Sequence, residues 1–280
     1  MGAAKAWRIT GTLAIVLVVL VAGLQTWSMA VQQRTDSTRP YDVVVHRLRL
    51  ETGNASVRVR AGQEGHVVVR QRLDWLLRKP VLSTVFEGDV LTVGMHCRLV
   101  LPFAEVGCGA EIDLEVPAGT EVSGSVGTGS VQLEGMSGDV RMELTSGQLV
   151  LSDTSGEVSV HGTSGLVRGT GLAAPRVSAQ LTSGAVELAF ARPPHEVEAT
   201  ATSGSVALFL PKDSRYAVSS EIGSGSGRID PALADSSSPN RVHTAVTSGA
   251  VTVLPSAFAP PPAASPAPSA SPPAPASSAP

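Results

Sequence analysis

The tripeptide Thr-Ser-Gly recurs every nine residues in the middle of the chain, where residues 145–165 read TSGQLVLSDTSGEVSVHGTSG. Glycines that follow Ser or Thr extend this register in both directions. Self-similarity at a fixed period is typical of repeat architectures, in which small units stack on one another. The predicted repeat turns are Gly129, Gly138, Gly147, Gly156 and Gly165, then Gly184, Gly204, Gly225 and Gly249 at intervals of 19 to 24 residues.

Apolar residues occupy fixed places after these glycines. The residues two and four positions later are apolar in eight of nine cases each, and the residue between them is mostly polar. A period of two is that of a strand with one buried face and one solvated face. The predicted core comprises Val131, Val140, Leu149, Val158, Val167, Val186, Val206 and Val251 at the first place, and Leu133, Met142, Leu151, Val160, Leu188, Leu208, Ile229 and Val253 at the second.

A unit of one turn and one short strand cannot bury its own apolar face, whereas stacked units merge their apolar columns into one core. Glycine supplies the backbone that a tight turn needs, and Ser and Thr hydroxyls bond nearby backbone groups. The sequence therefore predicts an all-β fold, a β-solenoid or β-helix-like stack over residues 121–254. Residues 33–120 are predicted to be an irregular β region or cap, with a hairpin around Gly88.

Residues 1–32 are predicted to enter a membrane. The stretch 9–27 holds 19 uncharged residues, close to the roughly 20 that cross a bilayer as a helix. Trp7 and Trp27 flank its apolar core, residues 13–24, as interfacial anchors do. These features indicate a membrane anchor.

A cleaved signal peptide is the alternative, because the most apolar core, residues 13–24, is short and Ser-Met-Ala at 28–30 fits a cleavage site. In both cases Lys5 and Arg8 hold the N-terminus in the cytoplasm. The protein is thus predicted to be single-pass with its C-terminal part outside the cytoplasm, or secreted after cleavage. Residues 255–280, almost entirely Pro, Ala and Ser, predict a disordered tail.

The two cysteines, Cys97 and Cys108, form a close even pair. In an exported domain such a pair usually forms a disulfide, which is the prediction here. Two other readings are a metal site with His96, which lacks ligands in sequence reach, and two free thiols.

Charge is unevenly distributed, with 11 basic and 7 acidic residues over 34–98 but 8 basic and 17 acidic over 101–254. An acidic repeat region argues against nucleic-acid binding, which requires a basic surface.

Catalytic and metal-binding signatures are incomplete. The motif HEVEA at His195 has Ala199 where a metalloprotease needs its second histidine. A glycine-rich stretch at 169–174 is followed by Pro175 instead of a helix. The repeats also lack the regularly placed Asp of a calcium roll. The sequence therefore predicts no catalytic residues, no cofactor and no metal.

The segment LEVPAGTEV, followed by SGDVRMEL, TSGQLVL, TSGEVSV, TSGAVEL and TSGSVAL, resembles the bacterial putative adhesin family, a domain of unknown function. The likeness spans roughly residues 40–254 and departs at 225–254, where DPALADSSSPNR interrupts the last coil. The resemblance implies a β-solenoid-like domain outside the cytoplasm, without assigned catalytic residues.

The first functional hypothesis is a non-enzymatic, membrane-tethered surface protein that contacts other proteins or the cell envelope. Its predicted contacts are the polar outward positions Arg141, Glu143, Glu157, Arg168 and Glu187. An envelope-stress accessory protein that contacts a membrane sensor is the second hypothesis, and a polysaccharide-active β-helix enzyme is the third. The oligomeric state does not follow from the sequence.

Overall fold

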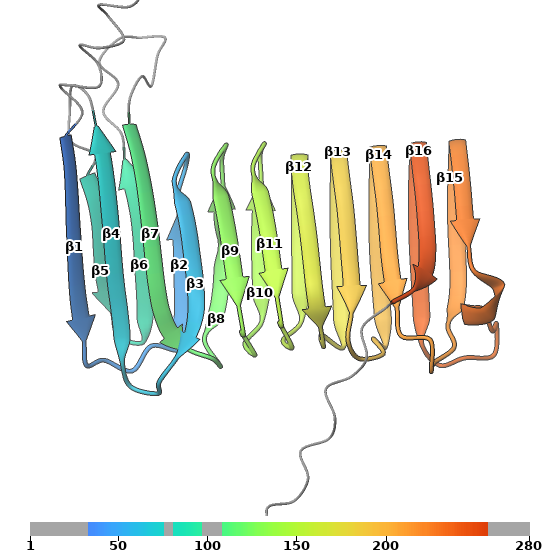
Figure 1. Cartoon of the computed structure of the whole chain (residues 1–280), viewed down its shortest axis with the longest axis horizontal. Helices are drawn as coiled ribbons and strands as arrows, with labels where there is room; N and C mark the ends of the chain where they lie inside the picture. Colours follow the sequence, from blue (N-terminus) through green and yellow to red (C-terminus); the bar gives the residue numbers. More distant parts are fainter. Residues whose placement is uncertain (1–32, 76–80, 97–107, 257–280) are drawn as a thin grey trace, which may run out of the picture.

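The computed structural model describes residues 33–75, 81–96 and 108–256. They form one curled β-sheet of 16 strands, whose two halves lie face to face along an elongated molecule. The half nearer the viewer in Figure 1 is called the front sheet, and the other half is called the rear sheet. A short 3-10 helix, η1 (Pro231–Leu233), lies near the C-terminal end. The strands are β1 (Gln33–Tyr41), β2 (Arg47–Glu51), β3 (Ser56–Gly62), β4 (Val67–Trp75), β5 (Val81–Glu87), β6 (Val90–His96), β7 (Cys108–Pro117), β8 (Glu121–Val126), β9 (Ser130–Glu134), β10 (Val140–Leu144), β11 (Gln148–Ser152), β12 (Val158–Leu172), β13 (Arg176–Phe190), β14 (Glu196–Leu210), β15 (Ala217–Ile229) and β16 (Arg241–Pro255).

The two sheets are built from successive arms of the same coils. The front sheet begins with β1, β4, β7, β3, β9 and β11, and the rear sheet with β5, β6, β2, β8 and β10. From β12 onward each strand passes through both sheets and bends at a Ser-Gly corner, so the sheets join into one curled sheet. The pairing is parallel except at the N-terminal end, where β1, β4 and β5 pair antiparallel.

The core lies between the two sheets and follows the repeat. Leu149 pairs with Val131 on one side and Val167 on the other, and Val167 pairs with Val186. These side chains are at most 1% exposed. Because successive coils are in register, identical positions stack into columns of aliphatic side chains, which is the arrangement that buries the apolar face of each short strand.

Glycine is required at the corners because neighbouring coils meet there backbone to backbone. A β-carbon on Gly184 would lie 2.0 Å from the carbonyl oxygen of Gly165. Gly184 also has a φ of 129°, a backbone angle that residues with a side chain rarely adopt. Close stacking and backbone conformation therefore both select glycine.

The coils are interleaved at both ends of the molecule. Near the N-terminus, β2 lies between β6 and β8. In the same way, β3 lies between β7 and β9. Near the C-terminus, β16 lies between β14 and β15, so β15 is the outermost strand. The order of coils in space thus differs from the order of the repeats in the sequence.

The segment that interrupts the last coil in the sequence covers the end of the core. It contains η1, and Leu233 of η1 is 1% exposed. Tyr216 donates its backbone N–H to Leu233 O, and Asp235 donates to Tyr216 O. These two hydrogen bonds pair the backbone of Tyr216, the residue before β15, at the outer edge of the sheet.

The N-terminal region contains the predicted hairpin. β5 and β6 pair antiparallel around Gly88, which has a φ of 62°, so this prediction is confirmed. Residues 1–32 and 257–280 lie outside the described residues, and so does Cys97, whereas Cys108 begins β7. The membrane segment, the tail and the disulfide remain predictions. Within the described ranges no helix is long and apolar enough to cross a membrane.

Candidate functional site

Strand register arranges the outward side chains of the rear sheet in rows along the molecule. One row reads Arg49, Ser123, Arg141, Ser159, Ser178, Glu198 and His243 across β2, β8, β10, β12, β13, β14 and β16. Short serines alternate with or follow longer charged side chains, so the surface is hollowed over the serines. The result is a shallow furrow, here called the rear groove.

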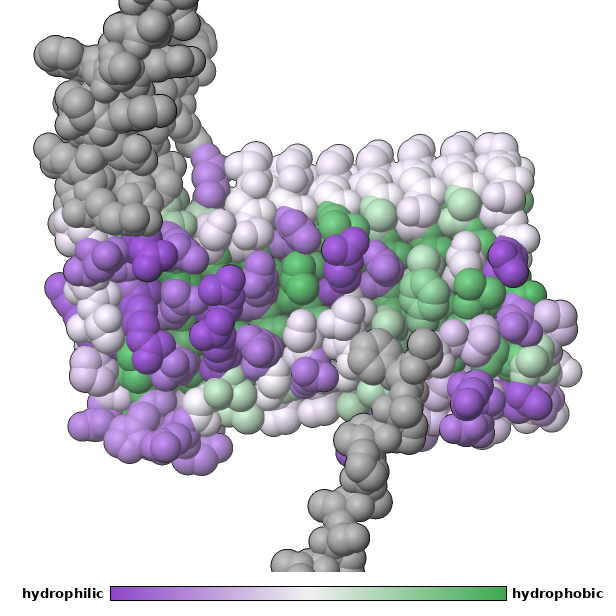
Figure 2. Space-filling model, viewed as in Figure 1, coloured by the Kyte–Doolittle hydropathy of each residue, from purple (hydrophilic) through white to green (hydrophobic). Residues whose placement is uncertain are grey.

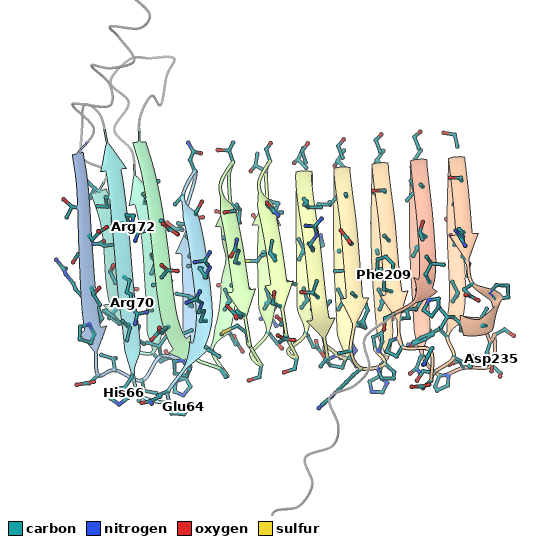
Figure 3. All side chains as sticks on the ribbon, in the orientation of Figure 1. Glu64, His66, Arg70, Arg72, Phe209 and Asp235 are labelled. Carbon is teal, nitrogen blue, oxygen red and sulfur yellow. The ribbon has the colours of Figure 1, made fainter. Side chains whose placement is uncertain are left out.

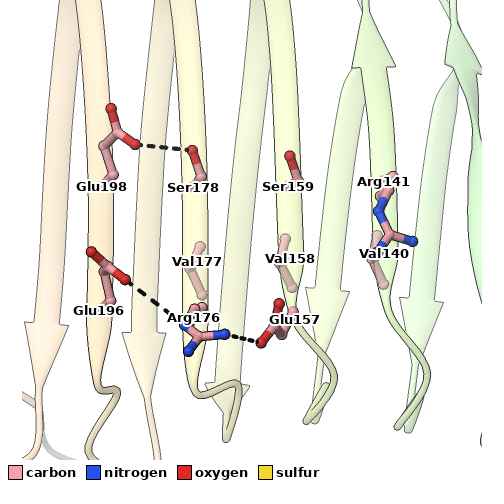
Figure 4. Close-up of a pocket in the computed structure, with 10 residues that line it drawn as sticks. All are labelled: Val140, Arg141, Glu157, Val158, Ser159, Arg176, Val177, Ser178, Glu196 and Glu198. Carbon is pink, nitrogen blue, oxygen red and sulfur yellow. Dashed lines mark hydrogen bonds and ion pairs between the residues drawn. The ribbon is translucent and has the colours of Figure 1, made fainter.

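Two adjoining cavities form the rear groove. One of about 330 Å³ lies over β10 to β14 (Figure 4), and the other, of about 490 Å³, lies over β2 to β12. Both are lined by Arg141 and Ser159, so they are continuous there. The six strands from β2 to β14 span five spacings of about 4.8 Å, or roughly 24 Å. The polar lining residues are Arg49, Glu51, Ser123, Ser125, Arg141, Glu143, Glu157, Ser159, His161, Arg176, Ser178, Glu196 and Glu198.

Charges of alternating sign border the groove near the lower ends of the strands in Figure 4. Arg176 Nη1 lies 2.7 Å from Glu157 Oε1, and Arg176 Nε lies 3.8 Å from Glu196 Oε2. Arg241 continues the row, with its Nη2 3.8 Å from Glu196 Oε1. The side chains of all four residues are 45% to 70% exposed, and such pairs contribute about 0–1 kcal/mol each. This row of four alternating charges, here called the charge ladder, therefore orients charged groups at the surface more than it stabilises the fold.

Carboxylate and hydroxyl groups meet inside the groove. Ser178 Oγ donates to Glu198 Oε2 at 3.4 Å, and Gln180 Nε2 donates to Glu198 Oε1 at 3.2 Å. Among the described residues no serine is hydrogen-bonded to a histidine, and no group of three His, Cys, Asp or Glu could hold a metal ion. The groups present are suited to binding a polar partner by hydrogen bonds and charge.

The end of the groove over β2 and β10 holds charges that are not neutralised locally. Within the part of the chain that the structure describes, Arg49, Glu51 and Glu143 have no ion-pair partner. Arg141 lies 3.2 Å from Asp139 and 4.0 Å from Glu121. A ligand with charges of both signs would find unpaired partners here.

The outward residues predicted as contacts divide between the two faces. Arg141, Glu143 and Glu157 line the rear groove. Arg168 and Glu187 lie on the front face, where Arg168 Nε donates to Glu187 Oε2 at 3.0 Å. Sequence reasoning did not single out Arg49 or Arg176, although each is a polar residue adjacent to an apolar, inward-facing strand residue.

The predicted repeat turns lie at the two opposite edges of the stack. Gly129, Gly147, Gly165, Gly184, Gly204, Gly225 and Gly249 occupy the corner between the rear and front arms, whereas Gly138 and Gly156 lie in turns at the other edge. All the predicted core residues are buried, with Val158 at 3% exposed, except Ile229 of β15. Ile229 is half-buried. Thus nine-residue units alternate between the two edges, and two units make one coil.

The front face has two chemically different halves (Figure 2). Over β4, β7 and β3 it carries ion pairs, including Arg72 Nη1 to Glu111 at 2.7 Å and Arg58 Nη1 to Asp113 at 3.3 Å. Over β13, β14 and β16 it carries outward apolar side chains, which are here called the apolar strip. They are Ala185, Ala189, Ala207, Phe209, Ala250 and Leu254, and the outward polar residues Glu187, Ser205 and Thr252 lie among them.

Several solved structures are similar to the chain. One is a putative adhesin from Bacteroides fragilis NCTC 9343, with 13% identity, 79% of this chain and 97% of that chain covered, and a TM-score of 0.48. A putative adhesin from Parabacteroides merdae ATCC 43184 has 15% identity, coverage of 78% and 96%, and a TM-score of 0.46. A putative cell adhesion protein from Clostridium sporogenes ATCC 15579 has 13% identity, coverage of 80% and 100%, and a TM-score of 0.40.

Likeness at this level carries no argument about function. No curated protein matches the chain. The model of the Toastrack DUF4097 family matches residues 110–253, just over half of the 280 residues. With its stacked parallel coils and Ser-Gly corners, the chain belongs to the Toastrack DUF4097 family.

Proposed function

We propose that this adhesin-like Toastrack protein is non-enzymatic, is tethered to the membrane outside the cytoplasm, and binds a protein partner of the cell envelope through the rear groove. The observation that supports this is the line of groups of both charge signs along the groove, some of them without local partners. Charged groups in a fixed pattern select a partner whose charges are complementary and speed its association.

A protein fits this groove better than a polysaccharide does. Sugar-binding faces commonly present aromatic rings, and the residues that line the two cavities include no aromatic side chain other than His161. Carboxylates and guanidinium groups in alternation instead match a polypeptide that carries both kinds of charge.

The tether is the predicted membrane segment of residues 1–32, which directly precedes β1. With residues 9–27 in the bilayer, the start of the fold lies only a few residues from the membrane. The rear groove would then be held close to the membrane, where envelope proteins are concentrated. A tethered binding protein gains effective concentration in this way without any new contact.

The groove can be tested with two matched charge reversals in the full-length protein. Arg176→Glu acts in the rear groove, and Arg168→Glu acts on the front face, where Arg168 has a similar ion pair and exposure. After crosslinking in intact cells, the protein partner recovered with the wild type should fall at least about tenfold for Arg176→Glu and stay unchanged for Arg168→Glu. Equal recovery with both variants would contradict the assignment of the groove.

Localisation and cellular role need separate measurements. Protease added to intact spheroplasts should digest the folded part, and the protein should sediment with membranes; an N-terminus that begins after residue 30 would show cleavage instead. Deletion of the gene should reduce surface attachment. An unchanged attachment with an altered response to cell-wall antibiotics would favour the envelope-stress hypothesis.

A further inference from the structure

The apolar strip on the front face is an unpartnered part of the sheet. Its side chains point outward, and Phe209 and Leu254 lie opposite each other on β14 and β16. Both are half-buried, and neither belongs to the hydrophobic core between the sheets. Outward positions of a solvated sheet are normally polar, and on the other half of this face they include the ion-paired residues Arg58, Arg70 and Arg72. An apolar surface of this kind usually marks a contact.

The described chain ends beside this strip. Ser256 donates its backbone N–H to Leu210 O at 2.7 Å, and its Oγ donates to Phe190 O at 3.1 Å. Leu210 and Phe190 are the last residues of β14 and β13, so Ser256 is fixed at the lower ends of these two strands. Phe209, one residue before Leu210, lies near this end of β14 on the front face (Figure 3). The next residue of the chain therefore starts within reach of the strip.

The sequence that follows Ser256 suits an apolar surface. Residues 257–262 read AFAPPP and carry no charge. After residue 209 the sequence contains two aromatic residues, Tyr216 and Phe258. Proline-rich segments are stiff and extended and lose little entropy on docking against aromatic side chains. At about 3.1 Å per residue, six residues cover roughly 19 Å, or about four strand spacings.

We propose that residues 257–262 lie across the apolar strip, with Phe258 packed on Phe209. The segment is covalently attached beside the surface, which gives it a high effective concentration there. An uncharged segment matches the strip and not the other half of the front face, where Arg58, Arg70 and Arg72 are paired with carboxylates. The C-terminal segment thus covers a hydrophobic surface that would otherwise face water. This contact does not involve the rear groove.

The contact can be tested by placing a photo-crosslinking phenylalanine analogue at position 258 of the full-length protein in its membrane. The expected crosslinks join position 258 to peptides of β13, β14 or β16 within the same chain. The analogue at position 279, near the end of the tail, serves as the control and should crosslink at least about fivefold less. A mixture of isotopically light and heavy protein distinguishes crosslinks within one chain from crosslinks between two chains.

Two surface variants show whether the strip itself is the receptor. Phe209→Ser should lower the crosslinking yield at least about fivefold, whereas Val68→Ser, an outward apolar position on β4, should leave it unchanged. As a second measurement, Phe258→Ser changes only the tail and should increase binding of a hydrophobic dye to the folded protein. Crosslinks mainly between chains would assign the strip to a second copy and overturn the proposal. Yields no higher than those of position 279 would overturn it as well.

Discussion

A β-carbon on Gly204 would lie only 1.8 Å from the carbonyl oxygen of Gly184, in the neighbouring coil. Backbone lies against backbone at this corner, and Gly204 has a φ of 145°. Any side chain would have to push two coils apart, and the same contact recurs between Gly204 and Gly249.

Gly204→Ala is therefore expected to lower the free energy of unfolding by at least about 2 kcal/mol, because it combines a steric clash with an unfavourable φ. Gly119→Ala is the control, since its added β-carbon would meet no atom within 4 Å, and a change within about 0.5 kcal/mol is expected. Denaturant titration followed by circular dichroism measures both. Similar effects of the two substitutions would contradict close packing at the corner.

Leu149 and Val150 are adjacent on β11 but face opposite sides of the front sheet. Leu149 is fully buried in the core, whereas Val150 points outward and is half-buried. Leu149→Ala should cost about 2–5 kcal/mol because it leaves a cavity between the sheets. Val150→Ala should cost less than about 1 kcal/mol. Thermal or denaturant unfolding of the two variants tests the facing of the strand, and an inverted order would refute it.

The Tyr216 hydroxyl is buried without a hydrogen-bond partner, within the part of the chain that the structure describes. A buried polar group without a partner destabilises the folded state. Tyr216→Phe should therefore raise the free energy of unfolding by about 1 kcal/mol. Tyr41→Phe, at a half-buried ring that packs on Phe86 with centroids 4.8 Å apart, should have little effect. A loss of stability in Tyr216→Phe would mean that the hydroxyl is satisfied.

Stability at high pH should also depend on Tyr216. Burial raises the pKa of Tyr216 to about 12. In the unfolded chain a tyrosine ionises near its ordinary pKa of 10.0. The unfolded state therefore loses its proton first, and this group's contribution to stability falls as the pH rises from about 10 to about 12. Tyr216→Phe should show a smaller fall over this range, and identical pH profiles would argue against a buried phenol.

Arg176→Ala should change the free energy of unfolding by less than about 1 kcal/mol, because the ion pairs of Arg176 are exposed and screened. A loss of several kcal/mol would show that the charge ladder holds the coils together. Urea titrations at low and high salt measure this contribution, which should shrink further as salt is added.

The repeat made much of the fold predictable. The spacing of the glycines predicts where strands such as β9 and β11 lie, because the tight corners require glycine. The alternation of the following residues predicts that Val131 and Leu149 point inward, because burial selects apolar residues at every second position. The N-terminal coil was harder to recognise. Ala55 occupies the corner place that glycine holds in other coils, so Val57 and Val59 follow Ala55 at the usual offsets but follow Gly53 at unusual ones.

The order of the coils could not be predicted, because alternation reveals which face of a strand is buried but not which strand lies beside it. Nothing in the sequence near Gly249 indicates that β16 separates β14 from β15. The rear groove was recognised only in part for the same reason. Arg176 and Glu157 are 19 positions apart in the chain, and only the register of β12 and β13 brings them together.

The position of β16 between β14 and β15 sets the time at which the fold can be completed. A polypeptide synthesised from its amino end delivers β14 and β15 before the strand that must separate them. Their shared neighbour β16 is made after both, so β15 has no strand to pair with until β16 has been synthesised. This end of the stack is therefore closed only when β16 inserts between two strands that were made before it.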